Sequence, residues 1–180
     1  PIKFIRKEGE NKKSIRIQFN NKEFVERLVS YGLPKGKKTF NINIPDSISD
    51  RNQIISIIRG LFQADGAFYF SRSKKIDFPS YPILEIITSS QILTNQLKNF
   101  LEKEGFMVYV KKGRTNYLQM SGEKMLNLWI EKIGFVSLKN LTKYKIWKSK
   151  GFYTPYTPLK RRLEICAGGT AATAVDFFKE

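Results

Sequence analysis

The sequence predicts an α+β fold in which four antiparallel strands carry helices on one face. Two observations lead to this fold class. From residue 50 the expected elements follow the order α-β-β-α-β-β-α-α, and no linker rich in Pro, Gly or Ser divides the chain. With 180 residues, 41% of them hydrophobic, the chain can bury a core of its own. We therefore expect one domain over 1–180, with an N-terminal extension over 1–48, a core over 49–165 and a C-terminal tail over 166–180.

The extension is predicted to have the order β-α-β. Apolar and polar residues alternate over 3–19 around a polar break at 8–11, which is typical of two strands joined by a turn. Asn21 can cap the helix that follows, and Gly32 is expected to end it. A basic loop then leads into a short strand over 40–44, and the glycine spacing of this loop does not fit a phosphate-binding P-loop.

The core begins with a helix over 50–66, whose apolar residues recur with helical spacing on one face. These residues are Ile54, Ile55, Ile58, Leu61 and Phe62. The remaining elements are strands over 67–74 and 81–88, a helix over 91–103, a hairpin over 107–120, and helices over 123–133 and 138–150. The three later helices are each expected to end at a glycine, namely Gly105, Gly134 and Gly151.

The composition favours a polyanionic partner. The chain has 32 Lys and Arg against 16 Asp and Glu, a formal net charge of +16, and 13% aromatic residues. A folded basic protein of this kind is typical of nucleic-acid binding, and a solvated basic surface without a specific partner is the alternative. With no histidine and a single cysteine, Cys166, the sequence excludes Ser-His-Asp and Cys-His catalytic sites, histidine zinc sites and disulfide frameworks. Chemistry must therefore use carboxylates, lysine, arginine, hydroxyls or a bound metal.

Membrane and secretion signals are missing from the pattern of the sequence. No stretch approaches the roughly eighteen consecutive apolar residues that a membrane span needs. Charge interrupts the apolar residues of 1–6, which is unlike a signal peptide. We expect a soluble intracellular protein without a membrane partner, located with the nucleoid in the cytoplasm or in an organelle.

A second face of the helix over 50–66 carries small residues. Gly60 and Ala64 lie one turn apart, although glycine inside a helix costs about 1 kcal/mol relative to alanine. Such a pair lets another helix approach closely, either from the same chain or from a second copy. In the second case two copies of Asp65 meet, and at about 4 Å and an effective dielectric near 20 they repel by roughly 4 kcal/mol. A divalent cation removes this repulsion and can assist phosphodiester hydrolysis without histidine.

Residues 58–66, Ile-Arg-Gly-Leu-Phe-Gln-Ala-Asp-Gly, resemble the nine-residue signature of the LAGLIDADG homing endonucleases. The similarity extends to the aromatic strand over 67–70, upstream to 32–45, and downstream to 87–90 and 134–144. It implies the αββαββα fold of that family, with a four-stranded antiparallel saddle and helices on one face. Because the signature occurs once, the resemblance also implies a homodimer, with an interface that includes Ile57, Gly60, Leu61 and Ala64.

The resemblance implies roles for individual residues. Asp65 matches the metal-binding catalytic acid, and the main-chain carbonyl of Ala64 matches its neighbour among the metal ligands. Lys139 matches the basic residue that positions or activates the attacking water, and Ser89 lies near the polar position that holds water at the metal. The implied cofactor is Mg²⁺ or another divalent cation such as Mn²⁺, whereas Ca²⁺ is expected to bind without supporting cleavage. Gln63 departs from the family pattern, in which an acid often occupies this position.

The implied partner is double-stranded DNA, with the strands lying along its major groove. In the strand after the signature one face carries polar residues, namely Tyr69, Ser71, Ser73 and Lys75, while Phe68 and Phe70 share the other face. In the second hairpin the corresponding polar residues are Tyr109, Lys111, Tyr117 and Gln119. A slip of one residue would exchange the two faces, so the sequence leaves open which face contacts bases. The residues expected to contact phosphates are Arg72, Lys74, Lys112 and Arg114, together with Lys143 on the last helix.

The leading interpretation is a site-specific homing endonuclease of intron or intein type. It would make a metal-dependent, staggered double-strand break across the minor groove of a long DNA target. Because the same family includes maturases, a splicing cofactor that binds group I intron RNA is the alternative. A non-cleaving DNA-binding regulator of the same fold is a third interpretation, against which Asp65 and Lys139 count. A basic RNA-binding module of another fold is the fourth.

Overall fold

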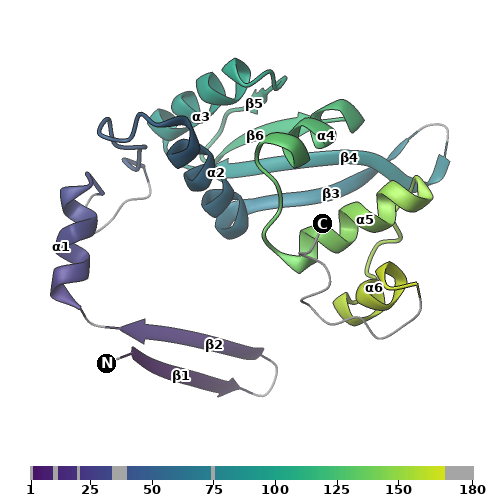
Figure 1. Ribbon diagram of the computed structural model, residues 1–180, viewed down its shortest axis with the longest axis horizontal. Coiled ribbons are helices and arrows are strands. Elements are labelled where there is room, and N and C mark those ends of the chain that lie inside the picture. Colours follow the sequence, from purple (N-terminus) through teal and green to yellow (C-terminus); the bar gives the residue numbers. More distant parts are fainter. Residues whose placement is uncertain (1, 10–11, 20, 34–39, 74–75, 169–180) are drawn as a thin grey trace. The chain divides into compact units, whose positions relative to one another are not determined.

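The computed structural model describes residues 2–9, 12–19, 21–33, 40–73 and 76–168 (Figure 1). In the first two of these ranges, and at residues 73, 76 and 77, it describes the backbone alone. Contacts within the chain group it into two compact units, Pro1–Lys38 with Pro45–Ser47 and Thr39–Ile44 with Ile48–Glu180. The predicted organisation as one domain, with an extension, a core and a tail, stays a prediction.

The first unit contains a hairpin and a short helix. Strand β1 (Ile2–Gly9) pairs antiparallel with β2 (Lys12–Phe19) along its whole length. Helix α1 (Lys22–Ser30) begins after Asn21, whose side chain accepts a hydrogen bond from the Phe24 amide at 3.0 Å. The predicted hairpin and helix cap are therefore confirmed.

The short strand predicted over 40–44 is wrong, because these described residues form a turn and an irregular stretch. Side chains take the place of a partner strand. The Ile44 amide donates to Gln96 Oε1 at 2.8 Å, and the Ile44 carbonyl accepts from Gln96 Nε2 at 2.9 Å. Ser90 Oγ donates to the Ile42 carbonyl at 2.6 Å. With these backbone groups satisfied, the segment needs no strand partner, and the described part of the extension has the order β-β-α.

The second unit is built on a four-stranded antiparallel sheet. Strands β3 (Gly66–Ser73) and β4 (Ile76–Thr88) form one hairpin, and β5 (Tyr109–Lys111) and β6 (Asn116–Ser121) form the other. The strand order is β3-β4-β6-β5, so the hairpins join through β4 and β6 and leave β3 and β5 at the edges. The predicted α+β fold with four antiparallel strands is confirmed.

Four helices pack on one face of this sheet (Figure 1). They are α2 (Arg51–Asp65), α3 (Gln91–Lys103), α4 (Glu123–Lys132) and α5 (Leu138–Lys150). Each contributes apolar side chains to one core, whose members include Ile58, Phe62, Leu97, Leu126, Trp129 and Ile146. This arrangement agrees with the predicted placement of the helices.

The register of the sheet determines which strand residues face this core. Phe68 lies opposite Leu84, and Leu84 lies opposite Met120, with exposed fractions of only 2%, 1% and 0%. The adjacent residues in each strand, such as Tyr69 and Gln119, lie on the other face and are more exposed. The apolar set therefore faces the helices, and the polar set lies on the open face.

Helix α6 (Leu159–Cys166) is an element that the sequence pattern does not predict. It follows Pro158 without a side-chain cap, and the residue that it buries is Arg162 rather than an apolar one. Its apolar residues Leu159, Leu163 and Cys166 recur with helical spacing, but eight residues are fewer than the window over which such a pattern predicts a helix. The described helices range from eight residues in α6 to fifteen in α2, and none of them is long and apolar enough to cross a membrane.

Candidate functional site

Helix α2 ends where the chain turns directly into β3. Asp50 begins the helix, because its carboxylate accepts a hydrogen bond from the Gln53 amide at 2.9 Å. Gly66 ends it, and a Cβ at this position would collide with the backbone and ring of Phe62. The tight turn therefore requires glycine, and it holds the backbone of Asp65 at the junction of helix and sheet.

The small-residue face of α2 is open in the described part of the chain. Gly60, Ala64 and Asp65 are exposed, and a Cβ added to Gly60 would meet no described atom within 4 Å beyond its own helix. Ile57 and Leu61 are partly buried and pack against the core. Within the second unit, the described residues therefore leave this face exposed.

A cavity of about 290 Å³ lies between the end of α2, the start of β3 and the first turns of α5. Gln63 lines it from α2, and Lys139 and Lys143 line it from α5. The fold thus brings Lys139 to a cavity that reaches the last turn of the signature helix. Asp65, exposed at the end of α2, and Ser89, half-buried after β4, do not line this cavity.

Lys143 is half-buried at the wall of this cavity. Its Nζ donates a hydrogen bond to the Phe68 carbonyl at 2.6 Å and lies 5.9 Å from the centre of the Tyr153 ring. Burial, and after it the charges of Lys139 and Arg162, lower the pKa of this amine to about 8. The lysine predicted to contact a DNA phosphate therefore lies in a cluster of cations.

Arg162 of α6 is a member of this cluster that the sequence does not indicate. Its side chain is only 6% exposed, and its Nη1 donates to the Lys139 carbonyl at 2.6 Å. This bond links α6 to the turn of α5 that carries Lys139. Because an arginine in a basic run is ordinarily exposed, nothing in the sequence distinguishes Arg162 from its neighbours Lys160 and Arg161.

The open face of the sheet carries the residues predicted to contact bases. Tyr69 and Tyr109 are 38% and 66% exposed, Lys111 is exposed, and Ser71 is half-buried. Glu85 of β4 is an acid on this face that no motif in the sequence indicates. Burial, and then a hydrogen bond to Glu85, raises the pKa of the Tyr69 hydroxyl to about 12.

Apart from Lys143 on α5, the described residues predicted to contact phosphates lie near hairpin turns. Arg72 is exposed where the register between β3 and β4 shifts. Lys112 and Arg114 are exposed between β5 and β6. The predicted residues whose side chains lie outside the described part of the structure are Ser73, Lys74 and Lys75.

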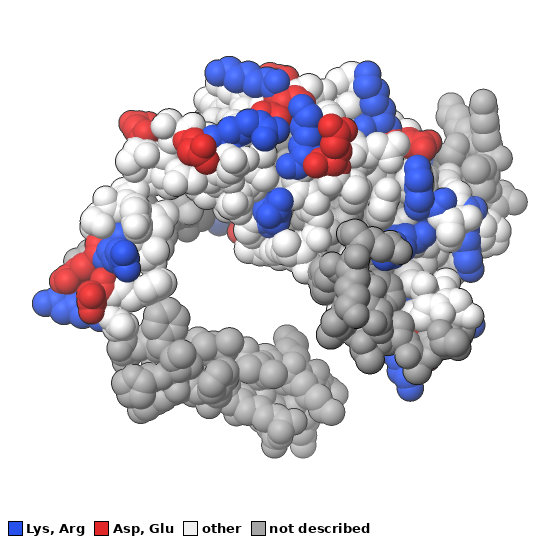
Figure 2. Space-filling model, in the orientation of Figure 1, with Lys and Arg blue, Asp and Glu red and all other residues white. Residues whose placement is uncertain are grey.

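Charge is distributed unevenly over the helices. Figure 2 shows acidic and basic side chains intermixed over α3 and α4, whereas basic side chains predominate over α5 and α6. On α3, Lys98 pairs with Glu102 at 2.6 Å, and on α4 Lys132 pairs with Glu104 at 3.2 Å. Helix α5 contains five lysines and no acid. The face formed by α5 is therefore the more attractive one for a polyanion.

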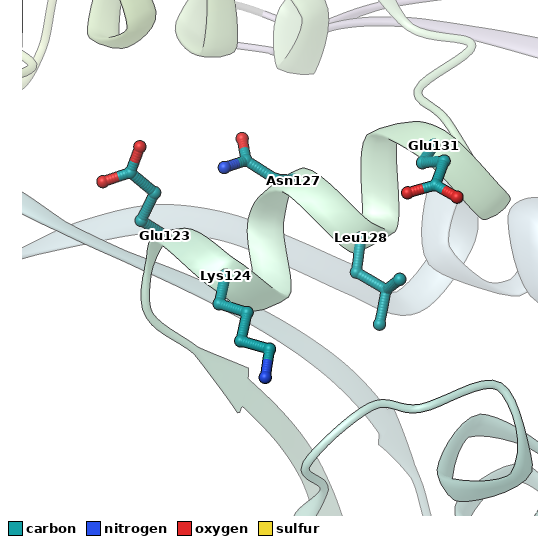
Figure 3. Close-up of a pocket in the computed structure, with 5 residues that line it drawn as sticks. All are labelled: Glu123, Lys124, Asn127, Leu128 and Glu131. Carbon is teal, nitrogen blue, oxygen red and sulfur yellow. The ribbon is translucent and has the colours of Figure 1, made fainter.

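A larger cavity, of about 540 Å³, lies along α4 and is lined from that helix alone. Figure 3 shows Glu123 and Asn127 pointing to one side of the helix, and Lys124 and Leu128 to another. Side chains that diverge from a single helix do not form a set of convergent polar groups. This cavity therefore lacks the arrangement expected of a catalytic or ligand site.

Comparison with known families identifies the class of protein. A family model described as a LAGLIDADG-like domain matches residues 52–155, which are more than half of the 180 residues. The chain therefore belongs to the LAGLIDADG homing endonuclease family. No curated protein matches the chain.

Two solved structures of homing endonucleases are similar to this chain. I-TnaI is 17% identical, the match covers 71% of this chain and 92% of that one, and the TM-score is 0.39. I-Vdi141I, an archaeal intron-encoded homing endonuclease complexed with DNA, is also 17% identical, with 66% and 70% of the two chains covered and a TM-score of 0.35.

Proposed function

We propose that this protein is a divalent-metal-dependent DNA endonuclease that acts as a homodimer and makes a staggered double-strand break in a long target. The observation that carries the proposal is the open end of α2. Gly60 and Ala64 expose a small-residue face beside Asp65, in a chain that belongs to the LAGLIDADG family. Two copies joined at this face would bring their Asp65 carboxylates together.

The donor atoms at the end of α2 fit a hard cation. The Asp65 carboxylate and the Ala64 carbonyl offer oxygen ligands, which Mg²⁺ prefers. Within the described residues of one chain, no group of three or more His, Cys, Asp or Glu could hold a metal ion. A site shared by two copies would supply a second Asp65 carboxylate. Bound there, Mg²⁺ or Mn²⁺ would act as a Lewis acid toward a phosphodiester and lower the pKa of a water ligand.

The remaining residues of the site have chemistries that suit DNA. Lys139 would position the attacking water, since it lines the cavity that reaches the last turn of α2. The open face of the sheet would lie in the major groove, where Tyr69 and Lys111 can reach base edges. Arg72 and Lys112 would hold the backbone without specifying sequence.

Cleavage can be tested directly with a randomised library of long duplexes. The protein is incubated with the library and Mg²⁺, and the ends that are produced are sequenced. The proposal expects a defined break with a constant stagger, which Mn²⁺ also supports and Ca²⁺ does not. If neither Mg²⁺ nor Mn²⁺ yields a defined break, the endonuclease proposal fails. Binding of group I intron RNA without cleavage of any intron-insertion sequence would instead favour a maturase.

The role of Asp65 can be separated from DNA binding. Asp65→Asn removes the negative charge at an exposed position, so we expect cleavage to fall by about a hundredfold or more while the affinity for DNA is kept. Asp46→Asn, a change at another exposed aspartate, is the matched control and should cleave like the native protein. Cleavage is followed on the selected target, and affinity by fluorescence anisotropy. An equal loss of cleavage and binding in Asp65→Asn would argue against a metal-ligand role.

A further inference from the structure

A second cavity that Lys143 also lines lies beside β3. It has a volume of about 270 Å³ and is bounded by β3, α5, α6 and the loop over 151–158. Lys143 lines it from α5 and Arg162 from α6. Arg162 and the whole of α6 follow the last residue of 52–155, the range that the family model matches. The cavity is therefore built partly from a segment outside that family match.

The charges in this cavity are unbalanced. Its described lining includes the cations Lys143 and Arg162 and no Asp or Glu. The nearest acid along α6, Glu164, is engaged by Arg161 at 3.0 Å. A guanidinium stays charged at any physiological pH, so Arg162 brings a permanent positive charge to the cavity. Two cations without a counter-ion repel each other, and an anion between them would remove that repulsion.

Arg162 is also incompletely hydrogen-bonded. The side chain is 94% buried, since its exposed fraction is 6%. Its Nη1 donates to the Lys139 carbonyl at 2.6 Å, but among the described residues its buried Nε has no hydrogen-bond partner. Leaving such a donor unpaired costs free energy, so native proteins usually supply a partner for it. The guanidinium therefore keeps one donor that no described protein atom satisfies.

The walls of the cavity are held in place by packing. The Tyr153 amide donates to the Pro79 carbonyl at 2.8 Å, which fastens the loop to β4. The Tyr153 ring is buried and stacks on Phe70, with ring centres 5.4 Å apart. Lys143 Nζ is fixed by its bond to the Phe68 carbonyl. The two cations are therefore positioned before any ligand arrives, which lowers the entropic cost of binding.

We propose that Lys143 and Arg162 form a binding site for a phosphate group, either a backbone phosphate of a nucleic acid or a free phosphate. A phosphate suits the cavity because its several oxygens can accept from a guanidinium and an ammonium at once. The site differs from the metal site at Asp65, and it needs neither a metal nor cleavage. Only the assignment to a nucleic-acid phosphate rests on the proposed binding of DNA.

Two probes test the site, both without divalent metal. Inorganic phosphate is titrated into the full chain by isothermal calorimetry, and a duplex of arbitrary sequence is titrated by fluorescence anisotropy. Lys143→Met and Arg162→Lys are compared with native protein. The second variant keeps the charge but loses the Nε donor and the fork of the guanidinium. Each variant should weaken at least one probe by about tenfold or more, which corresponds to the loss of one hydrogen bond to a charged group.

Matched controls separate the site from general charge. Arg161→Lys changes the neighbouring exposed arginine, and Lys124→Met removes an exposed lysine of α4. Both should bind the probes like native protein. Circular dichroism verifies that each variant is folded, and Lys143→Met does not depend on the bond that docks α6.

The two titrations distinguish the source of the phosphate. Loss in the duplex titration assigns the site to a nucleic-acid backbone, and loss with inorganic phosphate alone assigns it to a free phosphate. The proposal is overturned if folded Lys143→Met and Arg162→Lys bind both probes as the controls do. Because no cleavage is measured, this result is independent of whether the protein is an endonuclease.

Discussion

The charged form of the half-buried Lys143 destabilises the folded protein, so the free energy of unfolding depends on pH. Its pKa of about 8 in the folded protein lies below the ordinary value of 10.5. Between these two values the unfolded chain binds a proton that the folded protein has released. The free energy of unfolding therefore rises with pH across this window. The groups that face the amine are Lys139, Arg162, the Tyr153 ring and the Phe68 carbonyl.

Lys143→Met should remove this pH dependence. We expect the free energy of unfolding of native protein, relative to Lys143→Met, to increase from pH 7 to about pH 10. Urea denaturation of both proteins at several pH values measures the difference. Lys124→Met, which removes an exposed lysine, is the control and should not reproduce the increase. A difference that stays constant over this range would contradict the burial of the Lys143 amine.

At the scale of elements, one carboxylate links three helices. Glu104, directly after α3, accepts two hydrogen bonds from Arg51 of α2, both at 2.7 Å, and pairs with Lys132 of α4 at 3.2 Å. The bonds from Arg51 are the main reason that the pKa of Glu104 falls from 4.5 to about 2. The stabilisation from this group is therefore complete above pH 4.5 and is lost as the pH falls through about 2.

Glu104→Gln should accordingly destabilise the packing of these helices. We expect the free energy of unfolding at pH 7 to fall by roughly 1–2 kcal/mol, a value kept low because the Arg51 side chain is 52% exposed. The deficit should shrink as the pH approaches about 2. Glu102→Gln, at an exposed pair with Lys98, should change stability by no more than about 0.5 kcal/mol. Equal effects of the two substitutions in urea denaturation would contradict a special role for Glu104.

Elements with a periodic apolar face could be predicted from the sequence, and those held by distant polar contacts could not. The predicted bounds 91–103 and 138–150 agree with α3 and α5. The segment 40–44 alternates like a strand, but its hydrogen-bond partners lie about fifty positions away, beyond any local pattern. In α6 the apolar residues Leu159, Leu163 and Cys166 recur with helical spacing, but the helix has only eight residues, and the residue that it buries is an arginine.

In the candidate site, too, some features could be predicted from a local motif and others depend on distant contacts. The place of Asp65 at the end of α2 could be predicted because its signature is a local motif, in which Gly66 is required by the turn, whereas its role stays a prediction. Arg162 could not, because its burial depends on how α6 docks against α5. The sequence also leaves undecided which face of the sheet is open, because this depends on strand register; the burial of the paired Phe68 and Leu84 shows it. A sequence motif can therefore indicate a candidate site residue, but the residues that surround it depend on tertiary packing.

At the scale of the whole molecule, the net charge of +16 predicts how DNA affinity depends on salt. Each phosphate that a cation neutralises releases a counter-ion, so the logarithm of the affinity should fall linearly with the logarithm of salt, by about 0.9 per contact. Lys112→Met, at an exposed position near a hairpin turn, should reduce this slope by about one contact. Anisotropy titrations at several KCl concentrations measure the slope. An affinity that is insensitive to salt would contradict binding through the backbone.

The oligomeric state is tested most directly at Gly60, because one substitution there has opposite effects on a helix and on a dimer. In an isolated chain Gly60→Ala adds a methyl group where no described atom outside the helix lies within 4 Å. It should therefore raise the free energy of unfolding by up to about 1 kcal/mol. In a dimer joined through α2, the same methyl group holds the two helix backbones apart and weakens association.

Sedimentation equilibrium measures the dissociation constant of the dimer, and urea denaturation at low protein concentration measures the stability of the chain. We expect Gly60→Ala to raise the dissociation constant by about tenfold or more while it stabilises the monomer. Asn127→Ala, an exposed helical position on α4, is the control that improves helix propensity away from α2. If Gly60→Ala stabilises the chain and leaves association unchanged, the open face of α2 is not the dimer interface, and a metal site shared by two Asp65 carboxylates loses its basis.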